Sequence, residues 1–473
     1  MREPFVLLVL ATEALVLAIR LPDLVAPDTW LALVAGRKIA TGGLPHHDTL
    51  TIWPHGASWV DQQWLGQLLM YGTHSVGGLR LVLFLNAVVL VAAFALALGV
   101  ARSSGGSSRS VALVGAVALF VAFPNSVART QVFAFVFFVA VFALLAWDSR
   151  AASRRVFLVL PLLVLWANVH GSAVLGAGLV LLWALASVVR AVRRPGAGKV
   201  VLRAAGLALA APICLLASPY AFALPGYYRT VLASPAFRSF VTEWAPTSFP
   251  DQWPFFVLAV AALWLTARKP ARLSLFEHGA VLFTLVAGLA AVRNIAWFAL
   301  VTVMVVPRAL DDLWPAGQAP VRHRVNRAIS VAALVALVVA FGAIAIRQLE
   351  LAAHGYPSRA LASVTSATRT DPSPRVFANE WYSDWLIWNA PRLAGRLAFD
   401  ARFELLSTHQ IREVADFRAR TSPEWLSAAD GYRILVLDPR VETRAIRAVL
   451  REPGTRQLYR DRRIAVLLRS RPS

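Results

Sequence analysis

The stretch LVLFLNAVVLVAAFALALGV, residues 81 to 100, decides what kind of fold this chain can have. It contains no charged side chain. An α-helix needs roughly 20 apolar residues to cross the hydrocarbon core of a bilayer, and this stretch provides them. We therefore interpret Leu81–Val100 as a transmembrane helix.

Similar apolar runs lie on both sides of this stretch. The chain of 473 residues is 58% hydrophobic and 15% charged, whereas soluble domains average about 45–50% apolar and about 25% charged residues. The sequence predicts a mainly α protein, a polytopic transmembrane helix bundle of about 11 spans. Besides Leu81–Val100, the candidate spans are Phe5–Ile19, Val111–Phe123, Val132–Trp147, Val156–Val169, Ala173–Val189, Ala204–Ala217, Trp253–Ala267, Gly279–Val292, Ile295–Val306 and Ile329–Ile346.

The charge and cysteine content exclude several classes of protein. The formal net charge is +21, but the basic residues lie mainly in short loops between apolar runs and in the C-terminal tail, which argues against nucleic-acid binding. The single cysteine, Cys214, excludes an intrachain disulfide and a cysteine-based metal cluster. Arg20-Leu-Pro-Asp23 directly follows the first apolar run and does not resemble a signal-peptide cleavage site, so we interpret that run as a retained span.

Arginine and lysine concentrate in alternate loops, and cytoplasmic loops are the ones that carry positive charge. This pattern places the N-terminus in the cytoplasm and places residues 21–78, 218–252 and everything after Ile346 outside. We expect a transmembrane domain over residues 1–346, whose first outer loop (21–78) carries amphipathic helices, and an extracytoplasmic soluble α/β domain over residues 347–473. Strand-like runs in the latter are RVFAN (375–379), RLAFD (396–400), RILVLD (433–438) and RIAVLLR (463–469).

The first outer loop is far longer than a connection requires. Its first part predicts a helix with Asp28 as N-cap and Gly42-Gly43 as its end, and its last part predicts a second helix that starts at Asp61. Between them, His46-His47-Asp48 precedes an expected short hairpin of residues 50–53 and 58–60.

Asp28 and Asp61 have two interpretations. They could be ordinary helix caps, which are common. Alternatively, carboxylates that are partly desolvated beside apolar surface have raised pKa values and are competent bases, and both acids are expected just outside the membrane, where a lipid head group would pass.

Outward-facing cations and a histidine are further candidates. Arg129 and Arg293 each stand alone at the end of an apolar helix, on the side without a positive bias, so they could bind a phosphate or simply extend towards the interface. His170 is either a solvated loop residue or part of a site. In the tail, Asp384, Asp400 and Glu404 are expected to serve as caps.

Several segments, in order along the chain, resemble the GT-C membrane glycosyltransferases, specifically the bacterial branch of protein mannosyltransferases and RgtA/B/C/D-like enzymes. In the first loop these are Asp28-Thr-Trp30, Pro45-His-His-Asp48 and Trp59-Val-Asp-Gln-Gln-Trp64-Leu65. Later segments are Arg129-Thr-Gln131, Trp166-Ala-Asn-Val-His170-Gly171, Ser218-Pro-Tyr220, Glu243-Trp-Ala-Pro246 and Arg293-Asn294. The sequence departs from the family pattern at Leu31, where a histidine is usual, and at Gln62-Gln63, where an acid or histidine is frequent.

The resemblance implies a glycosyltransferase of the bacterial inner membrane. It would move a sugar from a polyprenyl-phosphate donor to a cell-envelope glycan, lipid or protein on the outer face, with inversion. It gives Asp28 the role of base or metal ligand, and any metal would be divalent, Mg or Mn, held by Asp28 and Asp61. The full set of candidates is Asp28, Asp61 and Asp48 as catalytic residues, and His46, His47, Arg129, Gln131, His170, Glu243, Arg293 and Asn294 as substrate-binding residues.

The main alternative is a transporter or flippase of lipid-linked envelope glycans. Such a protein should carry ionisable residues at mid-membrane depth, whereas the expected spans are nearly free of charge. A scaffold that binds envelope partners through its tail would need neither acid. Replacement of Asp28 by Asn would then leave it working.

Overall fold

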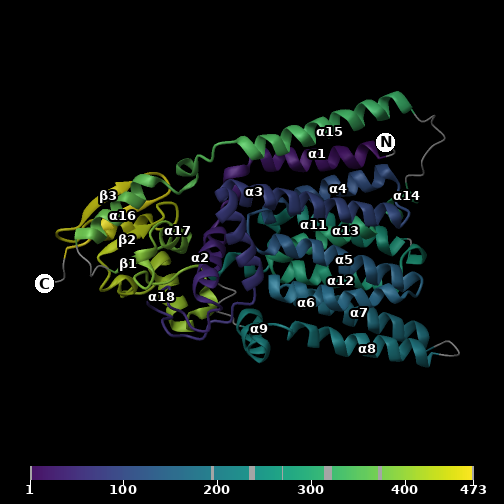
Figure 1. The fold of residues 1–473 in the computed structure, drawn as a ribbon, viewed down its shortest axis with the longest axis horizontal. Coiled ribbons are helices and arrows are strands. Elements are labelled where there is room, and N and C mark those ends of the chain that lie inside the picture. Colours follow the sequence, from purple (N-terminus) through teal and green to yellow (C-terminus); the bar gives the residue numbers. More distant parts are fainter. Residues whose placement is uncertain are drawn as a thin grey trace. The chain divides into compact units, whose positions relative to one another are not determined.

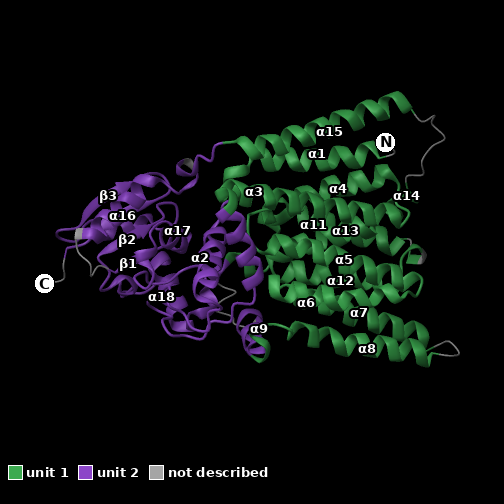
Figure 2. Ribbon diagram, viewed as in Figure 1, with its two compact units in different colours: residues 1–24, 76–222, 242–347 green, residues 25–75, 223–241, 348–473 purple. Residues whose placement is uncertain are grey.

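The computed structural model describes residues 3–192, 197–233, 240–268, 270–313, 322–370 and 375–470. Contacts divide the chain into two units, green and purple in Figure 2: unit 1 is residues 1–24, 76–222 and 242–347, and unit 2 is residues 25–75, 223–241 and 348–473. Residues 25–75 and 223–241 thus cluster with the C-terminal residues. The expected division into a transmembrane domain, 1–346, and an extracytoplasmic domain, 347–473, stays a prediction.

Unit 1 is helical (Figure 1). Six helices of the described chain are long and apolar enough to cross a membrane, as judged by length and composition: α3 (Trp64–Ser103), the Ser108–Asn125 segment that contains α4 (Ser108–Ala122), α5 (Gln131–Arg150), α7 (Ala173–Ala191), α8 (Gly198–Leu215) and α15 (His323–Ile346). Shorter apolar helices are α1 (Pro4–Ile19), α12 (Leu275–Ala290) and the Val292–Val305 segment that contains α13 (Ile295–Val305). The chain is an integral membrane protein, and the count of about 11 spans stays a prediction. The remaining α-helices of unit 1 are α6 (Val159–Val169), α11 (Phe249–Arg268) and α14 (Pro307–Asp311).

The centre of unit 1 is α13, whose sequence IAWFALVTVMV is apolar on every side. All eleven residues are buried, as expected for a helix without a polar face. Trp297 packs against Phe135 and Phe138 of α5 at ring-centroid distances of 4.8 and 4.9 Å, and against Trp166 of α6 at 6.1 Å. These aromatic contacts fix the ends of α5, α6 and α13 with respect to one another.

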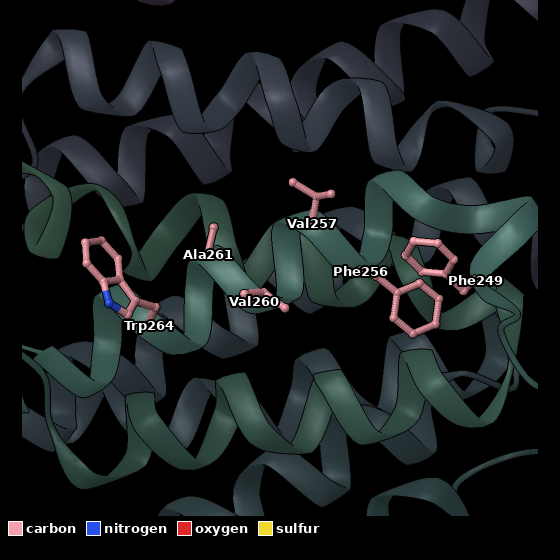
Figure 3. A pocket seen from close by; sticks show the side chains of 6 residues that line it. All are labelled: Phe249, Phe256, Val257, Val260, Ala261 and Trp264. Carbon is pink, nitrogen blue, oxygen red and sulfur yellow. The ribbon is translucent and has the colours of Figure 1, made fainter.

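One face of α11 carries an open apolar groove of about 460 Å³ (Figure 3). Its lining residues recur at helical spacing: Phe249, Phe256, Val257, Val260, Ala261 and Trp264. Just before the groove, Thr247 donates its backbone N–H to the carbonyl of Leu289, and Val292 donates to the carbonyl of Ala245. The start of the groove is therefore tied to the turn that precedes Arg293.

Unit 2 contains a four-stranded sheet in the order β1-β2-β4-β3. The strands are β1 (Val376–Ala378), β2 (Ile434–Leu437), β3 (Arg456–Arg460) and β4 (Ala465–Leu468); β1 and β2 are parallel, and the other pairs are antiparallel. Three of the four expected strand-like runs contain a strand. The fourth, RLAFD, makes only isolated bridges, and β3 was not predicted. The helices of unit 2 are α2 (Pro27–Gly42), the start of α3, α9 (Leu224–Ala233), α16 (Ser358–Thr370), α17 (Glu380–Asn389), α18 (Thr408–Ala419) and α19 (Thr443–Val449).

The first loop contains both expected helices, with corrections at their starts. Helix α2 ends where predicted, with Gly43 at φ 79°, a conformation that glycine adopts without strain. Its N-cap is Ala26, not Asp28, and Pro27 takes the first helical position. Asp28 therefore lies in the first turn, where a negative charge interacts favourably with the helix dipole. Helix α3 begins at Trp64, three residues after Asp61, and is kinked at Gly77 and Gly78.

The expected hairpin has a different pairing. His47 bridges Ser58, whereas Thr51 bridges Leu397 of the C-terminal segment. Ile52 and Trp53 donate their backbone N–H groups to the carbonyls of Leu397 and Ala398. The residues expected to be the first hairpin strand thus pair with the RLAFD segment, and Leu397 of that segment also bridges Val376 of β1.

Candidate active site

Asp48 organises the turn of the first loop. It is fully buried and accepts hydrogen bonds from the backbone N–H groups of Leu50 and Thr51 and from the Thr51 hydroxyl. Its Oδ1 also accepts a 2.6 Å hydrogen bond from Arg402. Both oxygens are occupied, so this geometry suits a residue that holds structure more than one that accepts a substrate proton.

Asp61 is different, because one oxygen of its buried carboxyl is not engaged. The residue is 2% exposed, and its Oδ2 has no hydrogen-bond partner among the described residues. Burial raises the pKa of Asp61 to about 7; the charge of Arg402, the backbone of Gln63 and the side chain of Gln67 each oppose this rise. A carboxyl with a pKa near neutrality and an available oxygen has the properties of a general base.

Arg402 is the cation that joins these acids. Its side chain is 2% exposed and its guanidinium lies 4.2 Å from the ring centroid of Trp59, two residues before Asp61. It bonds both oxygens of Asp400 as well as Asp48. These acids hold the pKa of Arg402 above its usual value despite the opposing effect of burial.

Asp28 belongs to the same electrostatic neighbourhood, together with two acids of the tail. Burial raises the pKa of Glu404 to about 7, and the charges of Asp400 and Asp28 add to the rise. The pKa of Asp384 is raised well above its usual value, first by burial and then by Asp400, with a smaller contribution from Asp28. Asp384 is fully buried and its Oδ1 has no partner among the described residues. As caps would, Asp384 and Asp400 accept backbone N–H groups, from Ala401 and Arg402, and Asp400 also bonds the Arg402 side chain.

The two histidines of the first loop lie on its surface. His47 is exposed and its Nδ1 lies 3.2 Å from the carbonyl of Gly56. His46 is also exposed, and its carbonyl accepts the N–H of Trp59. Both contribute to the turn between Asp48 and Trp59.

A second cluster, in unit 1, contains the two outward arginines. Arg129, which is 4% exposed, donates from Nη1 to both oxygens of Glu243 at 2.9 and 2.7 Å. Arg293 donates to Oε1 of Gln131 at 3.2 Å and stacks on the Trp244 ring at 4.5 Å. Burial would raise the pKa of Glu243, but Arg129 and Arg293 bring it below its usual value. The structure thus brings together residues that are far apart in the sequence.

His170 lies close to the same arginines. It is 8% exposed, and its Nδ1 lies 2.8 Å from the Ser172 hydroxyl and accepts the backbone N–H of Ser172. Burial, then Arg293 and Arg129, keep its pKa well below the usual value, so it is neutral at pH 7. Asn294 instead donates to the carbonyl of Ala287 near the end of α12, which is a structural role. Gln131 is 1% exposed and its Nε2 has no partner among the described residues.

Comparisons with known proteins give matches in structure only. No protein-family model matches the sequence, and the curated proteins give no match. The archaeal oligosaccharyltransferase AglB from Archaeoglobus fulgidus, in complex with an inhibitory peptide and a dolichol-phosphate, is similar with a TM-score of 0.57 and 13% identity over 92% of this chain and 69% of its own. ArnT from Cupriavidus metallidurans gives a TM-score of 0.50 and 14% identity over 93% of both chains.

A third similar structure is the arabinofuranosyltransferase AftD from Mycobacteria. It gives a TM-score of 0.51 and 15% identity over 97% of this chain and 41% of its own. These structural neighbours are GT-C glycosyltransferases, so this chain has the GT-C fold. The fold expected from the sequence resemblance is confirmed.

The sequence suggested a divalent metal held by Asp28 and Asp61, and this stays a prediction. The Archaeoglobus enzyme also has a structure in complex with Zn and sulfate. In the described part of the present chain, no group of three or more His, Cys, Asp or Glu side chains is arranged to hold a metal ion. The Arg402 guanidinium bonds both Asp48 and Asp400, and no step below is assigned to a metal.

Proposed function

We propose that this protein is a membrane glycosyltransferase that moves a sugar from a polyprenyl-phosphate carrier to a cell-envelope acceptor on the outer face of the bacterial inner membrane. The observation that carries the proposal is Asp61, a buried carboxyl with an available oxygen and a pKa of about 7, in a chain with the GT-C fold.

Asp61 acts as the general base in this proposal. It takes the proton of the acceptor hydroxyl as the acceptor oxygen attacks the anomeric carbon. The bond between that carbon and the carrier phosphate breaks, and the phosphate oxygen leaves with the electron pair, so the configuration inverts. The products are the glycosylated acceptor, the polyprenyl phosphate and a protonated Asp61.

Arg129 and Arg293 bind the carrier phosphate in this proposal. Arginine offers paired N–H donors that match phosphate oxygens, and a charge-assisted bond is about twice as strong as a neutral one. The Nε2 of Gln131 offers a further buried donor. Neutral His170 adds no charge beside them. The roles proposed for Glu243 and Trp244 are to orient Arg129 and Arg293.

The apolar groove on α11 accommodates the carrier tail in this proposal. The groove begins at Phe249, soon after the residues that pack on Arg129 and Arg293, and it continues to Trp264. A polyprenyl chain gains roughly 25 cal/mol for each Å² of apolar surface that it buries, if the alternative is water. In a bilayer the surroundings of the chain are already apolar, so the free energy of binding would come from the fit of the chain to the groove more than from its removal from water.

One observation favours the transporter alternative. Glu13, in the middle of apolar helix α1, is 5% exposed and its Oε2 has no hydrogen-bond partner among the described residues. A buried carboxyl at that position is the kind of residue that a proton-coupled transporter uses.

The two functions are separated by two reconstitutions, one in lipid nanodiscs for transfer and one in sealed vesicles for transport. The purified protein in lipid nanodiscs is supplied with radiolabelled polyprenyl-phosphate sugars and an envelope extract, and transfer is compared among wild type, Asp61→Asn and Asp28→Asn. Loss of transfer in Asp61→Asn supports the proposal. Unchanged transfer in both variants removes the mechanism. The alternative is supported if wild type transfers no sugar but transports a lipid-linked glycan across the vesicle membrane, and Glu13→Gln does not transport it.

A further inference from the structure

The C-terminal segment contributes one side chain directly to the turn that carries Asp61. Arg402 follows the RLAFD segment and reaches Asp48 across 354 residues of sequence. It also stacks on Trp59, and Trp59 itself is 2% exposed. One guanidinium therefore holds both ends of the turn from Asp48 to Trp59.

The backbone bonds of this turn make it a compact unit. Asp48 donates its N–H to the carbonyl of Ala57, Gly56 donates to the carbonyl of Asp48, and Trp59 donates to the carbonyl of His46. A displacement of Trp59 would move Asp61, because only Val60 separates them. The carboxyl of Asp61 is also within the electrostatic reach of Arg402.

We propose that Arg402 is a positioning residue for the transfer reaction, which fixes the Asp61 carboxyl through Asp48 and the Trp59 ring. This inference rests on the function proposed above. Arg402 itself need not touch the donor or the acceptor. Removing it should disturb the rate of the chemical step and not the affinity for the donor.

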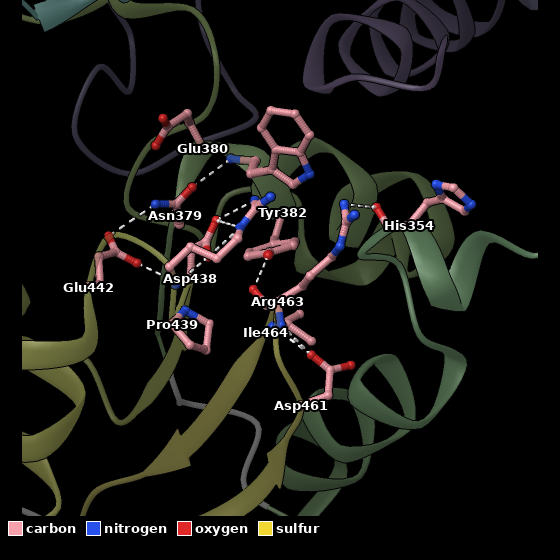
Figure 4. Close-up of polar contacts among 12 residues, drawn as sticks. His354, Asn379, Glu380, Tyr382, Asp438, Pro439, Glu442, Asp461, Arg463 and Ile464 are labelled. Carbon is pink, nitrogen blue, oxygen red and sulfur yellow. Dashed lines mark hydrogen bonds and ion pairs between the residues drawn. The ribbon is translucent and has the colours of Figure 1, made fainter. Parts of the chain in front are cut away.

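The chain contains a matched control for this residue. Asp438-Pro439-Arg440 repeats the Asp-x-Arg arrangement of Asp400 and Arg402, with the same bonds from the arginine backbone N–H, Nε and Nη2 to the carboxylate. Asp438 lies at the end of β2, near Asn379 and Glu442 (Figure 4). Arg440 is 43% exposed and stacks on Trp381 at 5.6 Å. It has the local motif of Arg402 without the bond to Asp48.

The test is a double-mutant cycle with Arg402→Gln, Asp61→Asn and the double variant, in nanodiscs, with Arg440→Gln as control. We expect Arg402→Gln to lower kcat at least tenfold and to change the donor KM less than twofold. In the Asp61→Asn background it should lower the residual rate less than twofold, because the group through which it acts is already gone. Arg440→Gln should stay within twofold of wild type.

Equal effects of Arg402→Gln with and without the Asp61 carboxyl would overturn the inference, since they would indicate a general structural role. If Arg402→Gln does not fold, Arg402→Lys takes its place in the cycle. Lysine keeps the charge but loses the planar stacking and the paired bonds. A wild-type kcat in Arg402→Lys would also overturn the inference. Hydrogen exchange of residues 46–61 needs no transfer activity. If wild type transfers no sugar, the proposed function is refuted. Faster exchange of residues 46–61 in the Arg402 variant would in that case still show that Arg402 positions the turn.

Discussion

Replacement of Asp61 by Asn should strongly lower the transfer rate and at the same time stabilise the protein at neutral and higher pH. Burial raises the pKa of this carboxyl from 3.8 to about 7. The folded state thus binds more protons than the unfolded state between these values, so stability falls as pH rises through the window. At about 1.36 kcal/mol for each pH unit, ionisation of Asp61 costs the fold up to about 4 kcal/mol above pH 7. Asparagine has the same shape and carries no charge.

The size of the gain depends on pH in a defined way. The bonds from Gln63 and Gln67 that favour the carboxylate are weakened in the variant, so the net gain at pH 8 should be smaller than the maximum, about 1–3 kcal/mol. Between pH 8 and pH 5 the advantage of Asp61→Asn over wild type should shrink by about 2–3 kcal/mol. Loss of a general base should lower the transfer rate roughly 10²- to 10⁴-fold.

Two assays on one nanodisc preparation check this prediction. Thermal unfolding of wild type and Asp61→Asn is followed at pH 5 and pH 8, and transfer from a labelled donor is measured at pH 8. Transfer by the variant at the wild-type rate would refute the reasoning. So would a stability gain of the variant over wild type that is smaller at pH 8 than at pH 5.

Three further results are expected. The kcat of the wild type should rise about tenfold per pH unit below pH 7 and level off above it, as a base with the pKa of Asp61 requires; a flat profile from pH 5 to pH 8 would exclude that base. Arg129→Gln and Arg293→Gln should each raise the donor KM at least tenfold. Arg20 is an exposed cation paired with Asp23, so Arg20→Gln should leave the donor KM unchanged. An equal KM in all three variants would contradict the proposed phosphate site. Val260→Asp in the α11 groove should raise the KM for a long-chain donor and not for a short isoprenyl analogue, and equal effects on both would show that the groove does not hold the tail.

Local sequence patterns predicted much of the fold. Uncharged runs such as Leu81–Val100 lie within long helices, and the Gly42-Gly43 pair ends α2 because Gly43 adopts a positive φ. The apolar runs at 376–378, 434–437 and 465–468 form strands. By contrast, β3 was not predicted. Its sequence is RQLYR, and because the strand lies exposed at the sheet edge, it does not show the alternation of apolar and polar residues that marks a half-buried strand.

The candidate site could be predicted only in part. Asp28, Asp48 and Asp61 stand out as acids in a long loop, and Arg129 and Arg293 stand out as charges at the ends of apolar helices. Nothing local in the sequence pairs residue 51 with residue 397, because a bridge of this kind depends on the tertiary contacts of both segments. Arg402 was missed for the same reason, although the repeated Asp-x-Arg arrangement at 400–402 and 438–440 is a signal that could have drawn attention to it.

The bond between Arg402 and Asp48 also has a consequence for the timing of biosynthesis. The two residues are 354 positions apart, so at about 5–20 residues per second the ribosome needs roughly 20–70 s between them. During that interval the turn before Asp61 lacks its guanidinium partner. A nascent chain, or a product of premature termination, that ends before residue 402 would therefore carry Asp61 without the Arg402 contacts that the positioning proposal requires.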